Sequence, residues 1–405
     1  MQSERAEPPH AGLRVLELAR VLAGPWIGQT LADLGAQVIK VESPEGDETR
    51  RWGPPFLTNV DGSAADAAYF HSCNRGKQSL VADLRKPQDR ERVVRLAREA
   101  DVLIENFKVG GLEKYGLDYA SLAPLNPGLV YCSISGFGQD GRYADRPGYD
   151  FVAQAMSGLM HITGEPERPP QKVGVAVADI VTGLYGLIGI QAALAQRARS
   201  GRGQRVDVAL LDSTIGILAN QAMNHLAGNM TPTRMGNAHP NIAPYQEFRT
   251  ADGFIVVAVG NDAQFGCLCE ALDCAPLAHD PRFATNGARV RNRSALDQAL
   301  GPHLAALRRD DALARLAAAR VPAGPINTVA EALRDPNTRE RGMVLDCPAQ
   351  GYREASIPGL ATPIRFSRSQ INVSRASPRL DSGRASGAWQ PRAAGDDADG
   401  PDDAD

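Results

Sequence analysis

The stretch LRVLELARVLAGPWIGQTLADLGAQVIKVE (13–42) decides the fold class. Within it, RVLEL (14–18) predicts a buried strand, and GPW (24–26) opens a helix with a proline in its first turn. Gly35 ends that helix, and QVIKVE (37–42) predicts the next strand. A strand, a helix and a second strand in this order are typical of a parallel βαβ unit.

The same alternation continues along the chain. Further strands are predicted at QSLVADL (78–84), DVLIEN (101–106), LVYCSIS (129–135) and RVDVALL (205–211). Helical spacing is present at 89–100 and 178–199, and Asp212 or Ser213 is expected to cap the helix after the last strand. These elements predict an α/β lobe with a doubly wound parallel sheet.

The pattern then changes. FRTADGFIVVAVGND (248–262) predicts two strands joined by an Ala-Asp-Gly turn, and helical segments follow at 263–272, 294–308 and 310–320. We therefore divide the chain into a large domain whose first part is 12–224, a smaller α+β domain at 225–325, a return segment to the large domain at 326–372, and a tail at 373–405. The tail is rich in Arg, Ser, Gly, Ala and Asp, and we expect it to be disordered.

Composition narrows the functional classes. A formal net charge of -3 argues against a nucleic-acid-binding protein, because no basic excess is present to neutralise phosphates. Six cysteines are too few for a disulfide framework, which favours a reducing cytoplasm. The N-terminal residues contain no apolar run typical of a signal peptide, and no uninterrupted apolar stretch reaches the ~18 residues of a membrane span. We expect a cytoplasmic protein without a membrane or nucleic-acid partner.

Two motifs have an ordinary structural explanation. Cys267, Cys269 and Cys274 lack the paired C-x2-C spacing of a zinc site, so core packing is favoured and no metal is expected. GFGQDG (136–141) matches the dinucleotide-binding pattern, but irregular chain rather than a helix follows it. Its glycines are expected to allow a tight loop beside a ligand.

Basic residues are scattered through the first lobe, several of them at the ends of predicted strands. They are Arg20, Lys40, Arg50, Arg51, Arg75, Lys77, Arg85, Lys108 and Lys114. Since α/β sheets bind ligands at the carboxyl ends of their strands, this distribution suits an anionic ligand that carries phosphates.

Asp179 lies in GVAVADIVTGLYG (174–186), at the predicted start of a long helix. An aspartate there is most often an N-cap, and the residue pattern alone favours that role. A carboxylate in an apolar, glycine-rich setting can also be a nucleophile, because the helix N-terminus would keep it ionised. The residues alone leave both roles open.

Together these segments resemble the family III CoA-transferases (CaiB/BaiF type). The likeness runs in order from about residue 12 to residue 370, through 13–42, NRGKQSLVADL (74–84), DVLIENFKVGGLEKYGL (101–117), SGFGQDG (135–141), GYDFVAQAMSGLMHITG (148–164), VGVAVADIVTGLYG (173–186) and SGRGQRVDVALLDS (200–213). RRWGPPF (50–56), GLMHITG (158–164), APYQEFRTADGFIVVAVGNDAQF (243–265) and VPAGPIN (321–327) are most similar to the succinyl-CoA:glutarate branch.

The resemblance implies a Rossmann-like large domain, a small domain, and an interlocked homodimer. It implies that Asp179 is the nucleophile and forms an aspartyl-CoA thioester, which reverses the preference for a cap. Coenzyme A thioesters are then substrates, and neither a metal nor a permanently bound cofactor is needed. The implied reaction moves CoA from an acyl-CoA such as succinyl-CoA to a small dicarboxylic acid.

The same resemblance implies the binding residues. The implied CoA contacts are Val21, Leu22, Ala23, Ala82, Asp83, Leu84, Arg85, Asn106, Phe107, Lys108, Lys114, Arg146, Pro147, Gly148 and Tyr149. Arg85 and Lys114 are expected to bind phosphates, and Arg20 and Arg51 are expected to hold the far carboxylate of a dicarboxylic acid.

At several positions the chain differs from other branches of the family, and these differences bear on which alternative functions are possible. Leu22 replaces a glutamine of the formyl-CoA:oxalate branch, and Tyr149 replaces a catalytic histidine of the racemase branch. LDSGRASG (380–387) replaces the usual start of a C-terminal helix. An acyl-CoA racemase or epimerase on the same fold and a non-catalytic CoA-binding protein remain the alternatives, and a nicotinamide-dependent dehydrogenase is disfavoured.

Overall fold

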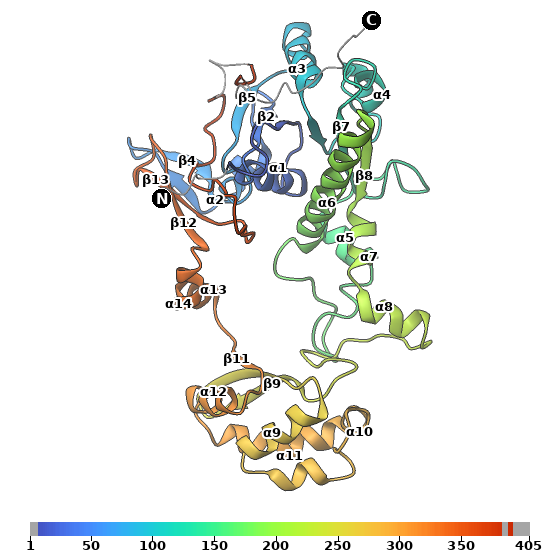
Figure 1. Ribbon diagram of the computed structural model, residues 1–405, viewed down its shortest axis with the longest axis vertical. Helices are drawn as coiled ribbons and strands as arrows, with labels where there is room; N and C mark the ends of the chain where they lie inside the picture. Colours follow the sequence, from blue (N-terminus) through green and yellow to red (C-terminus); the bar gives the residue numbers. More distant parts are fainter. Residues whose placement is uncertain (1–6, 383–387, 392–405) are drawn as a thin grey trace, which may run out of the picture. The chain divides into compact units, whose positions relative to one another are not determined.

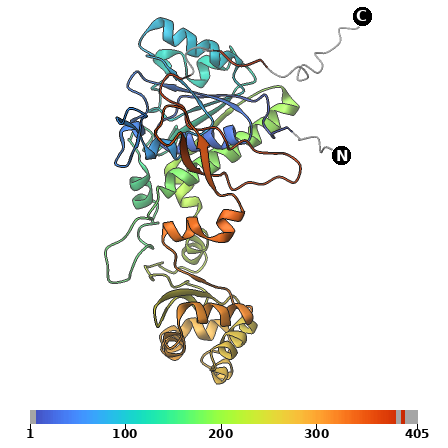
Figure 2. The same ribbon diagram turned by 90° about the vertical axis from the view of Figure 1, so that its left-hand side faces the viewer.

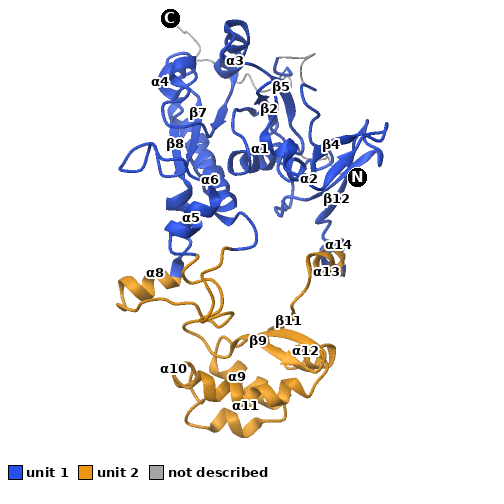
Figure 3. Cartoon of the chain, turned by 180° about the vertical axis from the view of Figure 1, so that it is seen from behind, with its two compact units in different colours: residues 1–159, 173–219, 336–405 blue, residues 160–172, 220–335 orange. Residues whose placement is uncertain are grey.

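The computed structural model describes residues 7–382 and 388–391 (Figure 1). Contacts divide the chain into two compact units, each with its own core (Figure 3). Unit 1 comprises Met1–Leu159, Val173–Ala219 and Pro336–Asp405, and unit 2 comprises Met160–Lys172 and Asn220–Asp335.

Unit 1 is built on a six-stranded parallel sheet with the order β5-β2-β1-β6-β7-β8. Its strands are β1 (Arg14–Glu17), β2 (Gln37–Glu42), β5 (Gln78–Val81), β6 (Val102–Glu105), β7 (Val130–Ser135) and β8 (Arg205–Ala209). The strand order reverses direction between β1 and β6, and ligands of such sheets bind beyond the carboxyl ends of the strands at that point. The predicted parallel α/β lobe is confirmed.

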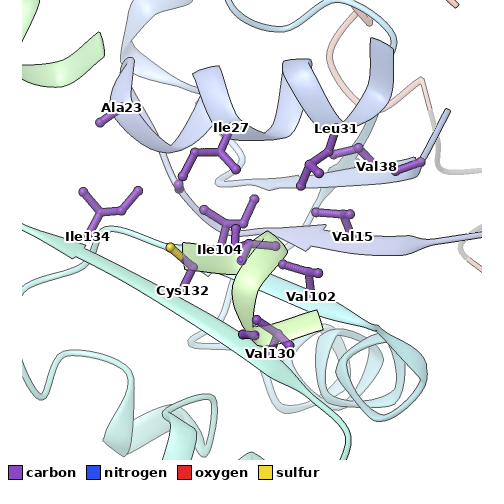
Figure 4. Close-up of a cluster of buried hydrophobic side chains, with 14 of the residues drawn as sticks. Val15, Ala23, Ile27, Leu31, Val38, Val102, Ile104, Val130, Cys132 and Ile134 are labelled. Atoms are coloured by element: carbon purple, nitrogen blue, oxygen red, sulfur yellow. The ribbon is translucent and has the colours of Figure 1, made fainter. Parts of the chain in front are cut away.

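Helices cover both faces of this sheet because its strands are apolar on both sides. Val15 and Val102 pack on one face, whereas their neighbours Leu16 and Leu103 pack on the other. The first face carries α1 (Ala23–Asp33), α5 (Asp150–Met156), α6 (Val177–Ser200) and α7 (Leu210–Gly216), and the second carries α3 (Pro87–Glu99) and α4 (Tyr119–Leu122). Figure 2 shows the sheet between α3 and α6, and Figure 4 shows Ile27 of α1 directed at the sheet.

Glycines bring α6 close to α1. A Cβ at Gly183 would lie 2.9 Å from the Ala23 carbonyl oxygen, and one at Gly186 would lie 2.6 Å from Ile27 Cδ1. The early turns of α6 therefore pack on the N-terminal half of α1, which brings Asp179 near the loop that precedes α1. By length and composition α6 could also cross a membrane, but the core helix of a soluble protein meets the same test.

Short elements complete unit 1. They are the 3-10 helices η1 (Glu48–Arg51) and η2 (Glu113–Tyr115), the hairpin of β3 (Phe56–Thr58) and β4 (Ala64–Ala67), α2 (Ala68–His71), α14 (Pro336–Glu340), and the hairpin of β12 (Val344–Pro348) and β13 (Ser356–Leu360). α7 begins at Leu210 without a side-chain cap, so the predicted capping by Asp212 or Ser213 is wrong. Both residues lie inside the helix, because β8 passes into α7 without an intervening loop.

Unit 2 has an antiparallel sheet with the order β11-β10-β9. Its elements are β9 (Tyr245–Thr250), β10 (Gly253–Ala258), β11 (Ala323–Pro325), α8 (Ala219–Leu226), α9 (Asp262–Ala271), η3 (Ala275–His279), α10 (Asn286–Arg291), α11 (Arg293–Ala305), α12 (Arg309–Ala318) and α13 (Val329–Arg334). Cys269 and Cys274 are buried in its core, whereas Cys267 is exposed, so the expectation of core packing is wrong for Cys267. The part of the chain that the structure describes has no cluster of three or more metal-ligating side chains.

The domain boundaries differ from those predicted. VPAGPIN (321–327) still belongs to unit 2, because β11 pairs with β10, so the return to unit 1 begins at Pro336 rather than at 326. Residues 160–172 also join unit 2, where the Gly236 N–H donates a hydrogen bond to the Gly164 carbonyl over 3.1 Å.

The start of the predicted disordered tail is packed on unit 1. Residues 373–382 and 388–391 are described, and the Gly76 N–H donates to the carbonyl oxygen of Arg375 over 3.1 Å. Trp389 is buried, and its indole N–H donates to the Leu96 carbonyl of α3 over 3.1 Å. Trp389 and several hydrogen bonds therefore anchor residues whose composition predicted disorder. The rest of the predicted tail, and most of LDSGRASG, lie outside the described residues.

Candidate active site at the first turn of α6

Two cavities of unit 1 open near the carboxyl ends of the parallel strands, and Arg20 and Phe107 line both. The cavity that contains Asp179 has a volume of about 290 Å³ and is lined by segments at 20–23, 106–109, 134–136 and 144–149 together with Glu48 and Leu210. The second, of about 320 Å³, is lined by segments at 41–45 and 82–85 together with Leu18 and Tyr115. The shared residues make these cavities one extended binding surface.

Most of the implied CoA contacts line this surface. The first cavity gathers Val21, Leu22, Ala23, Asn106, Phe107, Lys108, Arg146, Pro147, Gly148 and Tyr149, and the second gathers Ala82, Asp83, Leu84 and Arg85. Lys114 lines neither cavity, but its ammonium lies 4.9 Å from the ring centre of Tyr115, which lines the second. Arg51 lines neither, because its guanidinium donates to the Glu45 carbonyl.

Asp179 lies in the first turn of α6 but does not cap it. The N-cap position belongs to Ala176, and the helix has no side-chain capping hydrogen bond. Among the residues that the structure describes, none makes a hydrogen bond or ion pair with the half-buried Asp179 carboxylate. The capping role predicted from the residue pattern is therefore wrong.

Burial, together with a smaller contribution from the nearby charge of Asp150, raises the pKa of Asp179 to about 7. The sequence had predicted that the helix N-terminus would keep this group ionised. Loss of hydration instead dominates, so the carboxylate titrates near neutral pH. Such a shift in a cavity is typical of a functional group.

Two side chains of α5 fix the start of α6. The Ala178 N–H donates to Asp150 Oδ1 over 2.8 Å, and Gln154 Nε2 donates to Asp150 Oδ2 over 2.8 Å. The Val173 N–H in turn donates to Gln154 Oε1 over 2.9 Å. Sequence reasoning missed both residues; their i, i+4 spacing places them on one face of a helix, which is the signal that was present.

A buried cluster of charges supports the loop before α1. Lys40 Nζ lies 3.1 Å from Glu17 Oε1, 2.9 Å from Asp47 Oδ2 and 2.7 Å from the Ala19 carbonyl, and its side chain is fully buried. Asp47 Oδ2 also accepts the Val21 N–H over 3.3 Å. Val21 has a φ of 69°, a strained backbone conformation that such anchoring sustains.

Several basic residues predicted to face an anionic ligand are therefore structural. Lys40, Arg50, Arg75 and Lys77 are all buried, and each forms an ion pair within unit 1. None of the four directly follows the carboxyl end of a strand: Lys40 is inside β2, Arg50 is in η1, and Arg75 and Lys77 precede β5. The sequence could not show that carboxylates of neighbouring elements already neutralise them.

The GFGQDG loop shows why its glycines are present. A Cβ at Gly136 would lie 2.7 Å from Gly148 Cα, so the two loops that wall the Asp179 cavity touch through their backbones. The next helix, α5, begins only at Asp150, after both loops. This arrangement differs from a dinucleotide fingerprint, in which the helix opens directly from the glycine loop.

Comparisons with known proteins agree with this geometry. Residues 11–384 match the family described as CoA-transferase family III. The chain is 54% identical over 375 residues to a succinate–glutarate CoA-transferase of Agrobacterium fabrum, covering 92% of this chain and 93% of that protein. It is 39% identical over 373 residues to the succinyl-CoA:glutarate CoA-transferase of Homo sapiens, covering 92% and 83%.

A solved structure is also similar. The crystal structure of a CaiB/BaiF family protein from Brucella suis is 59% identical, with a TM-score of 0.83, and the match covers 94% of this chain and 98% of that one. The chain belongs to the family III CoA-transferases and is an enzyme that transfers coenzyme A.

Proposed function

We propose that this enzyme moves CoA from succinyl-CoA to a small dicarboxylic acid through a covalent aspartyl-CoA thioester on Asp179. The observation that carries the proposal is the unpaired Asp179 carboxylate in a cavity walled by the implied CoA contacts. The names of the similar proteins, which act on succinate and glutarate, support the choice of acids.

The steps follow from carboxylate chemistry. The Asp179 carboxylate attacks the thioester carbon of succinyl-CoA, the C–S bond breaks, and a mixed anhydride and CoA thiolate form. The thiolate attacks the aspartyl carbonyl, which releases succinate and leaves the aspartyl-CoA thioester. The acceptor carboxylate attacks that thioester, and the thiolate then attacks the acceptor carbonyl of the new anhydride, which frees Asp179. Each nucleophile reacts as an anion, so no proton transfer is required once Asp179, whose pKa is raised to about 7, is ionised.

The binding roles divide between the two cavities. We assign the reacting thioester to the cavity with Asp179, and the nucleotide end of CoA to the cavity with Ala82–Arg85. Arg20, which lines both, remains our candidate for an anionic group of a ligand. We do not retain Arg51 as a substrate contact, because its guanidinium is directed at Glu45.

We further propose that the enzyme is a homodimer. Three side chains of α6, Leu184, Tyr185 and Ile188, are exposed although they are large and apolar. An apolar cavity of about 580 Å³ is lined by Leu184 and by other residues of α1, α6 and β13. A second copy of the chain would bury this surface, and sedimentation velocity at several concentrations tests that expectation.

The reaction intermediate provides the test of the function. After the protein is mixed with succinyl-CoA and quenched with hydroxylamine, we expect a hydroxamate on the peptide that carries Asp179. Its matched control is Asp212→Asn, which alters another acid in the first turn of a helix and should label normally. Absence of label at Asp179 during measurable CoA transfer would overturn the covalent mechanism. Exchange of the α-proton of the acyl group without transfer would instead indicate a racemase.

A further inference from the structure

We propose that Glu48 is a specificity-determining residue, which competes with an anionic group of the ligand for the guanidinium of Arg20. The inference rests on the proposed function, since it concerns ligand binding beside Asp179. Neither the sequence pattern nor the resemblance pointed to Glu48.

The geometry of the pair carries the inference. Arg20 Nη1 lies 2.7 Å from Glu48 Oε1, and both residues line the cavity that contains Asp179. Glu48 Oε2 is buried and has no hydrogen-bond partner in the described part of the chain. Leaving a buried carboxylate oxygen unpaired is unfavourable. The pair is thus incompletely satisfied, because only one of the two Glu48 carboxylate oxygens meets Arg20.

The backbones of both residues are anchored, so only their side chains can exchange partners. The Arg20 N–H donates to Asn106 Oδ1 over 2.9 Å, and Asn106 Nδ2 donates back to the Arg20 carbonyl over 2.7 Å. Glu48 begins η1, whose N-cap Asp47 accepts the Thr49 N–H over 3.0 Å and is held by Lys40.

The side chains themselves remain accessible. Those of Arg20 and Glu48 are 46% and 40% exposed, and the Arg20 guanidinium lies 5.6 Å from the ring centre of Phe107. Rotation of either side chain releases the pair without disturbing the sheet.

The effect of Glu48 on ligand binding follows from its negative charge. A carboxylate or phosphate that reaches Arg20 must displace Glu48, so the intrinsic attraction of Arg20 for anions is reduced by the cost of that exchange. Removing the charge of Glu48 while keeping its shape should therefore strengthen binding of anionic ligands, and only while Arg20 is present.

The experiment is a double-mutant cycle of Glu48→Gln and Arg20→Met, with Glu91→Gln on the exposed surface of α3 as the matched control. KM is measured with succinyl-CoA for glutarate and for valerate, which lacks the far carboxylate. Dissociation constants are measured calorimetrically for CoA and for pantetheine, which lacks the phosphates. Thermal midpoints of all variants verify folding.

We expect Glu48→Gln to tighten binding about threefold to tenfold for one anionic ligand, and to have no effect in the Arg20→Met background. A gain for glutarate but not valerate identifies the anion as the far carboxylate. A gain for CoA but not pantetheine identifies it as a phosphate. No gain with any ligand, or an equal gain without Arg20, overturns the inference. The calorimetric results stand even if wild-type enzyme forms no aspartyl intermediate, so failure of the proposed function is distinguishable.

Discussion

Two regions of unit 1 contain acidic groups that are shielded from solvent, and the charge environment of these groups differs between the two. In the cluster beneath α1, Glu17 and Asp47 each lie within 3.1 Å of the Lys40 ammonium. In the first turn of α6, the Asp179 carboxylate has no such partner among the described residues. Burial would lower the pKa of Lys40, but the charges of Glu17 and Asp47 outweigh it and raise that pKa, whereas burial raises the pKa of Asp179 to about 7.

The difference separates a structural role from a chemical one. A buried charge with a partner contributes to the native state only while its partner remains. A buried carboxylate without a partner destabilises the native state when it is ionised, but it retains its nucleophilicity. The paired cluster holds the loop at Val21, and that loop lines the cavity in which the unpaired carboxylate lies.

Removing the unpaired acid is expected to have the largest effect on activity. We expect Asp179→Ala to reduce CoA transfer at least about 10⁴-fold, because the covalent route is lost, while the protein stays folded and binds CoA. Steady-state transfer from succinyl-CoA to glutarate measures the loss, and calorimetry measures CoA binding. Asp212→Asn is the control and should retain activity. Near-normal turnover by Asp179→Ala would contradict the assignment.

Removing the paired cation tests the other region. We expect Lys40→Met to lower the free energy of unfolding by about 3–5 kcal/mol, because Asp47 would stay buried without its ammonium partner and Glu17 would keep only that of Lys77. Lys86→Met changes an exposed lysine and should alter stability by less than about 0.5 kcal/mol. Urea unfolding measures both. Equal stability of the two variants would show that the cluster is not energetically coupled.

A smaller effect, which depends on pH, is expected on the free energy of unfolding. The pKa of Asp179 is raised in the folded state, so ionisation opposes folding; this penalty is absent below the ordinary pKa of 3.8 and complete above about 7. We expect Asp179→Asn, which cannot ionise, to be more stable than wild type by about 1–4 kcal/mol at pH 8, with a smaller gain at pH 5. Thermal unfolding across this range measures the gain. A gain independent of pH would rule out a raised pKa as its cause.

Local sequence predicted the architecture of unit 1 well. The β1, α1 and β2 segments occur where the 13–42 stretch placed them, because hydrophobic periodicity and a turn glycine act over a few residues. Local sequence predicted the structure less well where segments far apart in the chain pack together. The pairing of β11 with β10 extended unit 2 beyond its predicted end, and burial of Trp389 on α3 anchored a segment predicted to be disordered.

For the active site, the sequence by itself determined the position of Asp179 near the start of a long helix, because helical spacing acts over a few residues. Most of the residues around its cavity were implied by the resemblance to the family III CoA-transferases, whose short motifs they match. Only the tertiary structure decided which charges are paired. Lys77 meets Glu17 across 60 positions and Ala178 meets Asp150 across 28, while Asp179 meets no partner in the described chain. Pairing and desolvation depend on neighbours in space, and these set the difference between a structural ion and a reactive one.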